Sequence, residues 1–342
     1  MNKNNYKDTL QQIQNRFPTT ERKVSELISH IESDDPRLGF YEAVMKNQVD
    51  YCDKCIEVGE ETPVQNIIKQ IAVETLNGFQ PLHEMIGIQP MSGPVGLIYK
   101  LRTVKHGGKM ALEVISQTIE ASSRKLSARV NIEPIQDSVV DGVVVDIFDK
   151  DIQRAVGQEI ADEYSAEIVG ILTQYAKSHI VQPEEYGWRT VKYSSISTPE
   201  NFLCTINVAA NRIADRTRRG SGNFIIINQK ILDVIKDNRF YVPFSEEVSG
   251  GYLKQVGWLN DHYKVFLDKY DTENNVIVGY KGPAGETDAG LFFAPYVPVM
   301  STGIVINPVT FEPVLSFMTR YRLFEDEMSK DYYSGFNISF DK

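Results

Sequence analysis

The chain has 342 residues, 42% hydrophobic and 24% charged, a composition typical of a globular protein with one large or two ordinary domains. Its formal net charge of −10 argues against a protein that wraps DNA or coats an anionic membrane, since such proteins are usually basic. No apolar run approaches the roughly 18 residues of a membrane helix, and the N-terminus lacks a secretion signal. Three cysteines argue against a disulfide framework, so we expect synthesis in a reducing cytoplasm.

The first 78 residues are polar and carry few apolar positions. Capping residues and spacing predict helices over 6–15, 19–31 and 38–57, and one more within 64–86 that ends at Asn77-Gly78. The segment has too little apolar surface to form a domain alone. We therefore expect an arm that lies on another surface, which would cover Leu27, Ile28 and Ile31.

A long hairpin is predicted next, around the turn Gly107-Gly108. Apolar and polar residues alternate with period two on both sides of this turn, from Val95 to Ile119, which is a strong hairpin signal. An isolated two-stranded hairpin is marginally stable in water, and nothing local covers this one. We therefore expect the hairpin to rest on another part of the molecule or on another subunit.

The longest predicted element is a helix over 151–181, without proline and with apolar residues three and four positions apart. A helix of this length would extend about 45 Å. We interpret it as the spine on which a sheet or an extended domain lies. After it, we predict a helix over 201–216, capped by Thr198 with Pro199 in its first turn, then a buried strand over 224–227 and strand-rich segments to the C-terminus.

Residue patterns that support catalysis or cofactor binding are missing from this sequence. Cys52 and Cys55 form a lone Cys-x-x-Cys pair, whereas a structural zinc site needs four ligands. The stretch RRGSGNF does not match a phosphate-binding loop, and no HExxH or GxSxG motif occurs. We therefore predict no catalytic residue, no metal and no cofactor. Arg216, Arg218 and Arg219 form a basic cluster that favours pairing with carboxylates over contact with nucleic acid.

Four stretches together resemble the major capsid protein of T-even-like tailed bacteriophages. They are QPMSGPVGLIYKLR, IEASSRKLSARVNIEPIQD, RTRRGSGNFIIIN and a C-terminal set with VGYKGPAGETDAGLFFAPYVPV and NPVTFEPVLSFMTRY. The similarity runs in order over about two thirds of the chain, from Phe79 to Tyr321. The T-even proteins are longer, and they carry an inserted domain where this chain has only TVKHGGKMALEVISQTI.

This resemblance implies an α+β chain with the Johnson (Hong Kong phage-type) capsid fold, which has an N-terminal arm, an extended hairpin called the E-loop, and peripheral and axial domains. The expected divisions are an arm over 1–78, a leading peripheral segment over 79–94, the E-loop and return strand over 95–134, the peripheral domain with the spine helix over 135–197, the axial domain over 198–303, peripheral strands over 304–331 and a C-terminal strand over 332–342.

The resemblance also implies a major capsid protein of the virion shell, assembled in the host cytoplasm. Its main partner would be itself: copies of the chain would form hexamers, with pentamers of the same chain as an open alternative. Vertex, portal, scaffold and decoration proteins are further candidate partners, and the shell would enclose double-stranded DNA without sequence-specific binding or membrane contact. The alternatives are the paralogous vertex protein, which forms only pentamers, an α/β enzyme, and a nucleic-acid-binding protein that uses the arginine cluster.

Two groups of residues are candidate subunit contacts. The first is the hairpin tip, Lys105, His106, Gly107, Gly108 and Lys109, expected to dock on a neighbouring subunit. The second is the arginine cluster, expected to pair with acidic residues of the same or the adjacent subunit.

A third expectation concerns processing of the arm. The maturation protease of T-even-like phages cuts after a Glu that follows Leu or Ile by two residues, and residues 1–80 lack this pattern. Its first occurrence is Leu82-His83-Glu84. We therefore expect the arm to be retained.

Overall fold

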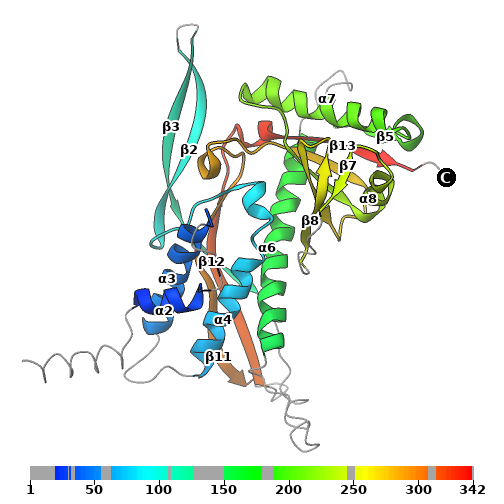
Figure 1. Cartoon of the computed structure of the whole chain (residues 1–342). Coiled ribbons are helices and arrows are strands. Elements are labelled where there is room, and N and C mark those ends of the chain that lie inside the picture. Colours follow the sequence, from blue (N-terminus) through cyan, green and yellow to red (C-terminus); the bar gives the residue numbers. More distant parts are fainter. Residues whose placement is uncertain are drawn as a thin grey trace, which may run out of the picture.

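The computed structural model describes residues 20–29, 31, 35–54, 63–106, 109–126, 150–178, 188–244, 251–306 and 313–340. These residues form helices, a four-stranded sheet, a seven-stranded sheet and a separate two-stranded sheet, so the predicted α+β class is confirmed. In Figure 1 the long helix α6 (Lys150–Ser178) runs through the middle of the molecule. The seven-stranded sheet lies beside its upper end, and the two-stranded sheet projects from the other side.

Helix α6 confirms the predicted long helix as far as Ser178, and residues 179–181 of the prediction lie outside the described residues. Its buried stripe includes Ile160, Ile168 and Leu172. Gly157 lets helix α4 (Pro63–Asn77) approach closely, because a Cβ atom at this position would lie 2.9 Å from the carbonyl oxygen of Ile71. A glycine that weakens an isolated helix is thus required here by packing.

The N-terminal region contains three of the four predicted helices: α2 (Thr20–Leu27), α3 (Leu38–Lys54) and α4 (Pro63–Asn77). The predicted helix over 6–15 lies outside the described residues. Val44 and Met45 of α3 are fully buried, and Ile28 is 6% exposed. Leu27 and Ile31 pack against the same core. The described part of the predicted arm is therefore integrated into the main core of its own chain.

Helix α3 also completes the edge of a strand. The Gln48 amide donates to the carbonyl of Val299 at 2.8 Å and accepts from its N–H at 3.1 Å. Gln48 is fully buried, so its side chain replaces a neighbouring strand at this point.

The four-stranded sheet has the order β1-β11-β12-β4. Its strands are β1 (Gly87–Ile88), β11 (Phe292–Ile306), β12 (Pro313–Phe324) and β4 (Ser122–Leu126). The short helices η1 (Leu82–Glu84) and η4 (Gly285–Thr287) precede β1 and β11. The long pair β11 and β12 runs along the lower part of α6 in Figure 1.

The seven-stranded sheet has the order β5-β13-β10-β6-β9-β8-β7. Its strands are β5 (Thr190–Lys192), β13 (Tyr333–Ser339), β10 (Asn275–Gly279), β6 (Phe224–Asn228), β9 (Tyr263–Asp268), β8 (Leu253–Leu259) and β7 (Tyr241–Pro243). Strands β5 and β13 pair in this sheet although they lie outside the range predicted for the axial domain. The division into peripheral and axial domains stays a prediction.

Helices cover both faces of this sheet. The side of Ile277 faces α6, whereas Val278 on the other side lies beside helix α7 (Pro199–Thr217). Thr198 caps α7 by accepting a hydrogen bond from the amide of Asn201, and Pro199 follows it, as predicted. The remaining short helices are η3 (Tyr193–Ser195), α8 (Gln229–Lys236) and η5 (Ser329–Tyr332).

The two-stranded sheet is the predicted hairpin. Strands β2 (Val95–His106) and β3 (Lys109–Glu120) pair along their full length, from Val95 opposite Glu120 to His106 opposite Lys109. The hairpin projects away from the body in Figure 1.

Candidate subunit-contact site

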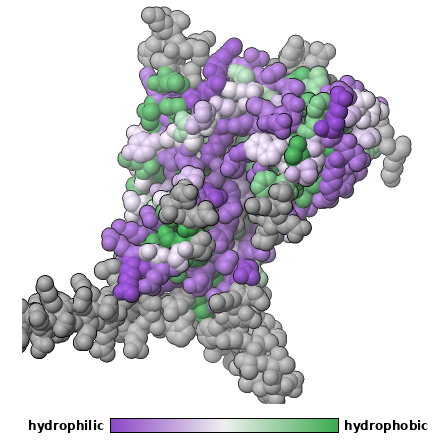
Figure 2. Space-filling view, viewed as in Figure 1, coloured by the Kyte–Doolittle hydropathy of each residue, from purple (hydrophilic) through white to green (hydrophobic). Residues whose placement is uncertain are grey.

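One face of the hairpin exposes apolar side chains. Its members are the most exposed large apolar side chains of this sheet: Val95 (57%), Leu97 (52%), Tyr99 (46%), Leu112 (63%) and Val114 (65%). The strand register places all five on one face, because residues directly opposite each other point to the same side. Figure 2 shows apolar residues along the hairpin at the upper left. We name this set the hairpin stripe.

The other face anchors the hairpin base to the body. Ile98 (1% exposed) and Ile119 (6%) join a small second core with Phe292 and Phe324. This core is separate from the main one around α6. The hairpin therefore buries one face near its base and leaves the hairpin stripe without a covering element among the described residues.

A buried ion pair strengthens the same anchor. The Lys100 ammonium lies 2.7 Å from a carboxylate oxygen of Asp326, and its side chain is 5% exposed. The ammonium also lies 5.3 Å from the ring centre of Tyr332 and 5.6 Å from that of Phe292. Burial lowers the pKa of Lys100, and Asp326 opposes this shift. The carboxylate and the two rings compensate in part for the loss of water around the cation.

Gln89 fixes the edge of β2 beside this anchor. Its amide donates to the carbonyl of Tyr99 at 2.7 Å and accepts from the N–H of Tyr99 at 2.9 Å. The same amide nitrogen donates to the carbonyl of Glu286 in η4 at 2.7 Å. Gln89 therefore connects the hairpin with the loop that leads into the four-stranded sheet.

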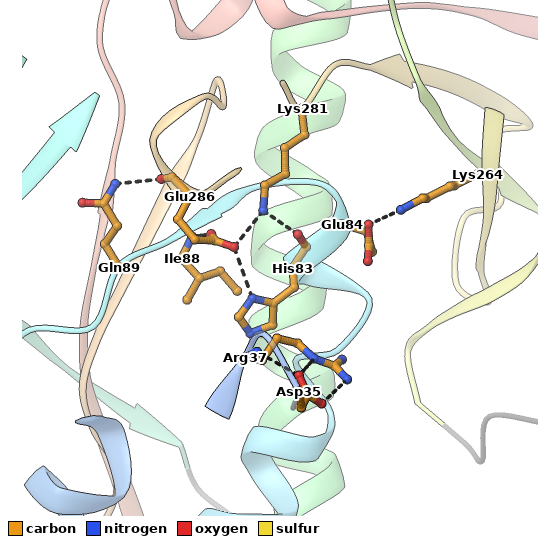
Figure 3. Close-up of polar contacts among 9 residues, drawn as sticks. All are labelled: Asp35, Arg37, His83, Glu84, Ile88, Gln89, Lys264, Lys281 and Glu286. Atoms are coloured by element: carbon orange, nitrogen blue, oxygen red, sulfur yellow. Dashed lines mark hydrogen bonds and ion pairs between the residues drawn. The ribbon is translucent and has the colours of Figure 1, made fainter. Parts of the chain in front are cut away.

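Figure 3 shows a group of polar contacts beside Gln89, centred on Glu286, which we name the polar junction. The Glu286 carboxylate lies 3.0 Å from the Lys281 ammonium, accepts from the N–H of Ile88 and lies 3.6 Å from Nδ1 of His83. Lys281 also donates to the carbonyl of His83. Burial would raise the pKa of Glu286, but His83, Lys281 and the Ile88 amide outweigh it, so the pKa is lowered. Glu286 thus stays ionised and holds β1 against η4.

Two further ion pairs extend the junction in Figure 3. Glu84 of η1 pairs with Lys264 of β9, which connects η1 with the seven-stranded sheet. Asp35 binds Arg37 through two side-chain contacts at 2.8 and 2.9 Å just before α3. The contact with Arg37 lowers the pKa of Asp35. The junction therefore determines how the hairpin base sits relative to both sheets.

The predicted hairpin-tip residues are described only in part. Lys105 and His106 end β2, and Lys109 begins β3. Gly107 and Gly108 lie outside the described residues. The role of this tip at a subunit contact stays a prediction.

The three arginines of the predicted cluster have different environments. Arg219 pairs with Asp288 of the same chain, and their side chains are 10% and 0% exposed. Burial would lower the pKa of Arg219, but Asp288 outweighs this effect, so the pKa is raised. Arg216 donates to the carbonyls of Arg212 and Tyr333. Arg218, with a side chain 60% exposed and 3.9 Å from Asp215, remains accessible to a second subunit.

Sequence reasoning missed the residues that hold the hairpin base. Lys100 shares a face with the buried Ile98, so the alternation alone could have marked it as a buried cation. Its partner Asp326 is 226 positions away, and no local pattern indicates such a pair. Gln89 and Glu286 likewise carry no distinguishing motif.

Several known proteins are similar to this chain in sequence. The major capsid proteins of Enterobacteria phages T6 and T4 are each 32% identical to this chain, over 62% of it and over 46% and 44% of their own lengths. The major capsid protein of Vibrio phage KVP40 is 28% identical over 62% of this chain and 45% of its own. The chain thus spans less than half the length of these relatives.

Similar solved structures include a virus-like particle from Pyrococcus furiosus, with a TM-score of 0.45 and 12% identity over 79% of this chain and 98% of that one. The capsid of Myoviridae phage XM1 has a TM-score of 0.42 and 8% identity over 76% of this chain and 92% of that one. A family model described as major capsid protein Gp23 matches residues 104–338. Because this match covers more than half of the chain, the chain belongs to the major capsid protein Gp23 family, in agreement with the resemblance found in its sequence.

Proposed function

We propose that this chain is a shell subunit that assembles with copies of itself into hexamers, and that the hexamers form the icosahedral head around the double-stranded DNA genome. Membership of the Gp23 family supports this function. The observation on the chain itself that carries it is the hairpin stripe. A soluble monomer rarely leaves several large apolar side chains side by side in water, whereas such a patch is typical of a protein contact.

Docking of the hairpin on a neighbouring subunit is the central contact of this proposal. The base is fixed by Lys100, Gln89 and the second core, so the hairpin is presented at a defined angle before assembly. Preorganisation of this kind reduces the entropy lost on binding. One surface of each copy would then meet a different surface of the next, as closure of a ring requires.

Negative-stain electron microscopy of the purified chain tests this function. We expect shells, tubes or sheets of hexamers. Particles built only from pentamers would instead support the vertex protein, and small discrete oligomers that bind a metabolite would support an enzyme. A variant that lacks residues 105–109 should fold as the wild type and assemble poorly. Normal shells from this variant would refute the docking role of the tip.

A further inference from the structure

A cavity of about 300 Å³ lies between α6 and the seven-stranded sheet, away from the hairpin and its junction. Small apolar side chains form part of its wall, with Ala166 and Val169 from α6 and Ile226 and Ile277 from the sheet. The turn between β9 and β10 closes one side. This volume falls at the lower end of the range for small-molecule sites, roughly 300 to 1,000 Å³.

Two tyrosines form an aromatic wall of this cavity. The rings of Tyr252 and Tyr270 stack with centres 5.0 Å apart and planes inclined by 23°. Tyr270 is 65% exposed, so a large aromatic ring stays at the surface beside the opening. The face of a tyrosine ring attracts a cation within about 6 Å of its centre.

The Asp268 carboxylate also lines the cavity, and it has no cationic partner among the residues that the structure describes. Asp268 is 5% exposed, and one of its oxygens accepts from the backbone N–H groups of Tyr270 at 2.9 Å and Asp271 at 3.2 Å. Its other oxygen lies 3.5 Å from the Tyr252 hydroxyl, which is the limit for a hydrogen bond. Within the described part of the chain, no lysine or arginine forms an ion pair with it. Burial raises the pKa of Asp268, and the charge of Asp271 adds to this shift.

The helix side of the cavity is open at Gly170. A Cβ atom at this position would meet nothing within 4 Å, so the helix surface leaves free space beside Thr173 and Tyr270. A larger side chain at Gly170 would extend into that space. It would also favour the helix, since glycine is the least favourable residue inside a helix apart from proline.

We propose that this cavity binds a small alkylammonium ion with the dimensions of a short aliphatic diamine. The alkyl chain would lie against Ala166, Val169 and Ile277, and one ammonium group would contact Asp268 and the tyrosine rings. This ligand supplies the missing cation and matches the apolar wall. A divalent metal fits less well, because metals such as Mg²⁺ and Ca²⁺ need several converging oxygen ligands, and no group of three candidate ligands occurs among the residues described.

Isothermal titration calorimetry of the full-length chain with 1,4-diaminobutane tests the proposal, at constant ionic strength so that general charge screening is matched. We expect saturable binding with one site per chain. Asp268→Asn keeps an oxygen for the two backbone N–H groups and removes the charge, so we expect at least a tenfold loss of affinity. Gly170→Leu should abolish binding without lowering the melting temperature, because it fills the cavity from a helix position that tolerates a side chain.

Glu327→Gln is the matched control, because Glu327 is exposed and remote from the lining residues, and its removal also changes the net charge by one. We expect it to bind as the wild type. The proposal is overturned if the wild type shows no saturable binding up to roughly 10 mM diamine. It is also overturned if Asp268→Asn and Gly170→Leu, both folded by circular dichroism, bind as tightly as Glu327→Gln.

Discussion

Replacing the most exposed members of the hairpin stripe should weaken assembly without unfolding the subunit. Leu112→Thr with Val114→Thr is the appropriate change, because threonine keeps the strand preference and removes apolar surface. The two side chains are 63% and 65% exposed in the free chain. Their replacement should therefore change the free energy of unfolding by no more than about 0.5 kcal/mol.

The effect on assembly follows from the same exposures. Burying a whole valine or leucine side chain contributes about 1.5–3 kcal/mol, and nearly two thirds of each side chain is still available for a contact. Threonine retains a methyl group, so we expect a loss of about 1 kcal/mol per position, or about 2 kcal/mol per docked hairpin. This corresponds to a roughly thirtyfold weaker contact.

Light scattering during assembly measures this change as a higher critical concentration, and thermal circular dichroism checks the fold of the dispersed subunit. Gln117→Thr on the opposite face of the same strand is the control and should assemble as the wild type. An unchanged critical concentration for the double variant would refute the reasoning. A large drop in its melting temperature would show that the stripe is part of the fold.

Four further outcomes are expected. Asp288→Ala leaves the buried Arg219 cation unpaired and should destabilise the chain by about 3–5 kcal/mol in denaturant unfolding, whereas Arg219→Met with Asp288→Leu should lose less. Arg218→Glu changes an exposed cation, so the melting temperature should stay unchanged, while sedimentation should show fewer intact rings if Arg218 contacts a second subunit. Altered DNA packaging with intact rings would instead favour contact with nucleic acid. Because the folded-state pKa of Asp268 is raised, the free energy of unfolding should fall as pH rises from about 4 through the folded pKa. Asp268→Asn should make this fall smaller, and an unchanged pH profile would contradict the raised pKa. Finally, the folded chain should resist cutting after Glu84, because Leu82 is fully buried and Glu84 is paired with Lys264. The intact mass of the protein from mature virions should therefore include residues 1–84, and a mass several kilodaltons lower would reveal an N-terminal processing site.

The local residue pattern was sufficient to predict those elements whose conformation depends on neighbouring residues in the chain. The period-two alternation around Gly107-Gly108 predicted a hairpin with the observed pairing, and the Thr198 cap with Pro199 predicted the start of α7.

Long-range contacts could not be predicted in the same way. The arginine cluster was expected to pair with acidic residues, but its sequence did not indicate the partner of each arginine. Arg219 pairs with the buried Asp288, whereas Arg218, at a left-handed backbone position with φ of 56°, is exposed. The cavity beside α6 depends on Gly170, Asp268 and Tyr252, which meet only when the sheet packs on the helix. Such sites arise from packing, so their residues carry no shared spacing in the chain.

The two glutamine amides have a consequence for the free chain. An unpaired strand edge invites another strand, and such pairing leads to uncontrolled polymerisation. Gln48 closes the edge of β11 at Val299, and Gln89 closes the edge of β2 at Tyr99. Each does so with one side chain, which occupies the hydrogen-bonding groups without adding a strand. If the chain assembles as proposed, we expect these two contacts to reduce unwanted strand pairing of the free chain, while its apolar hairpin face stays available for a neighbouring copy.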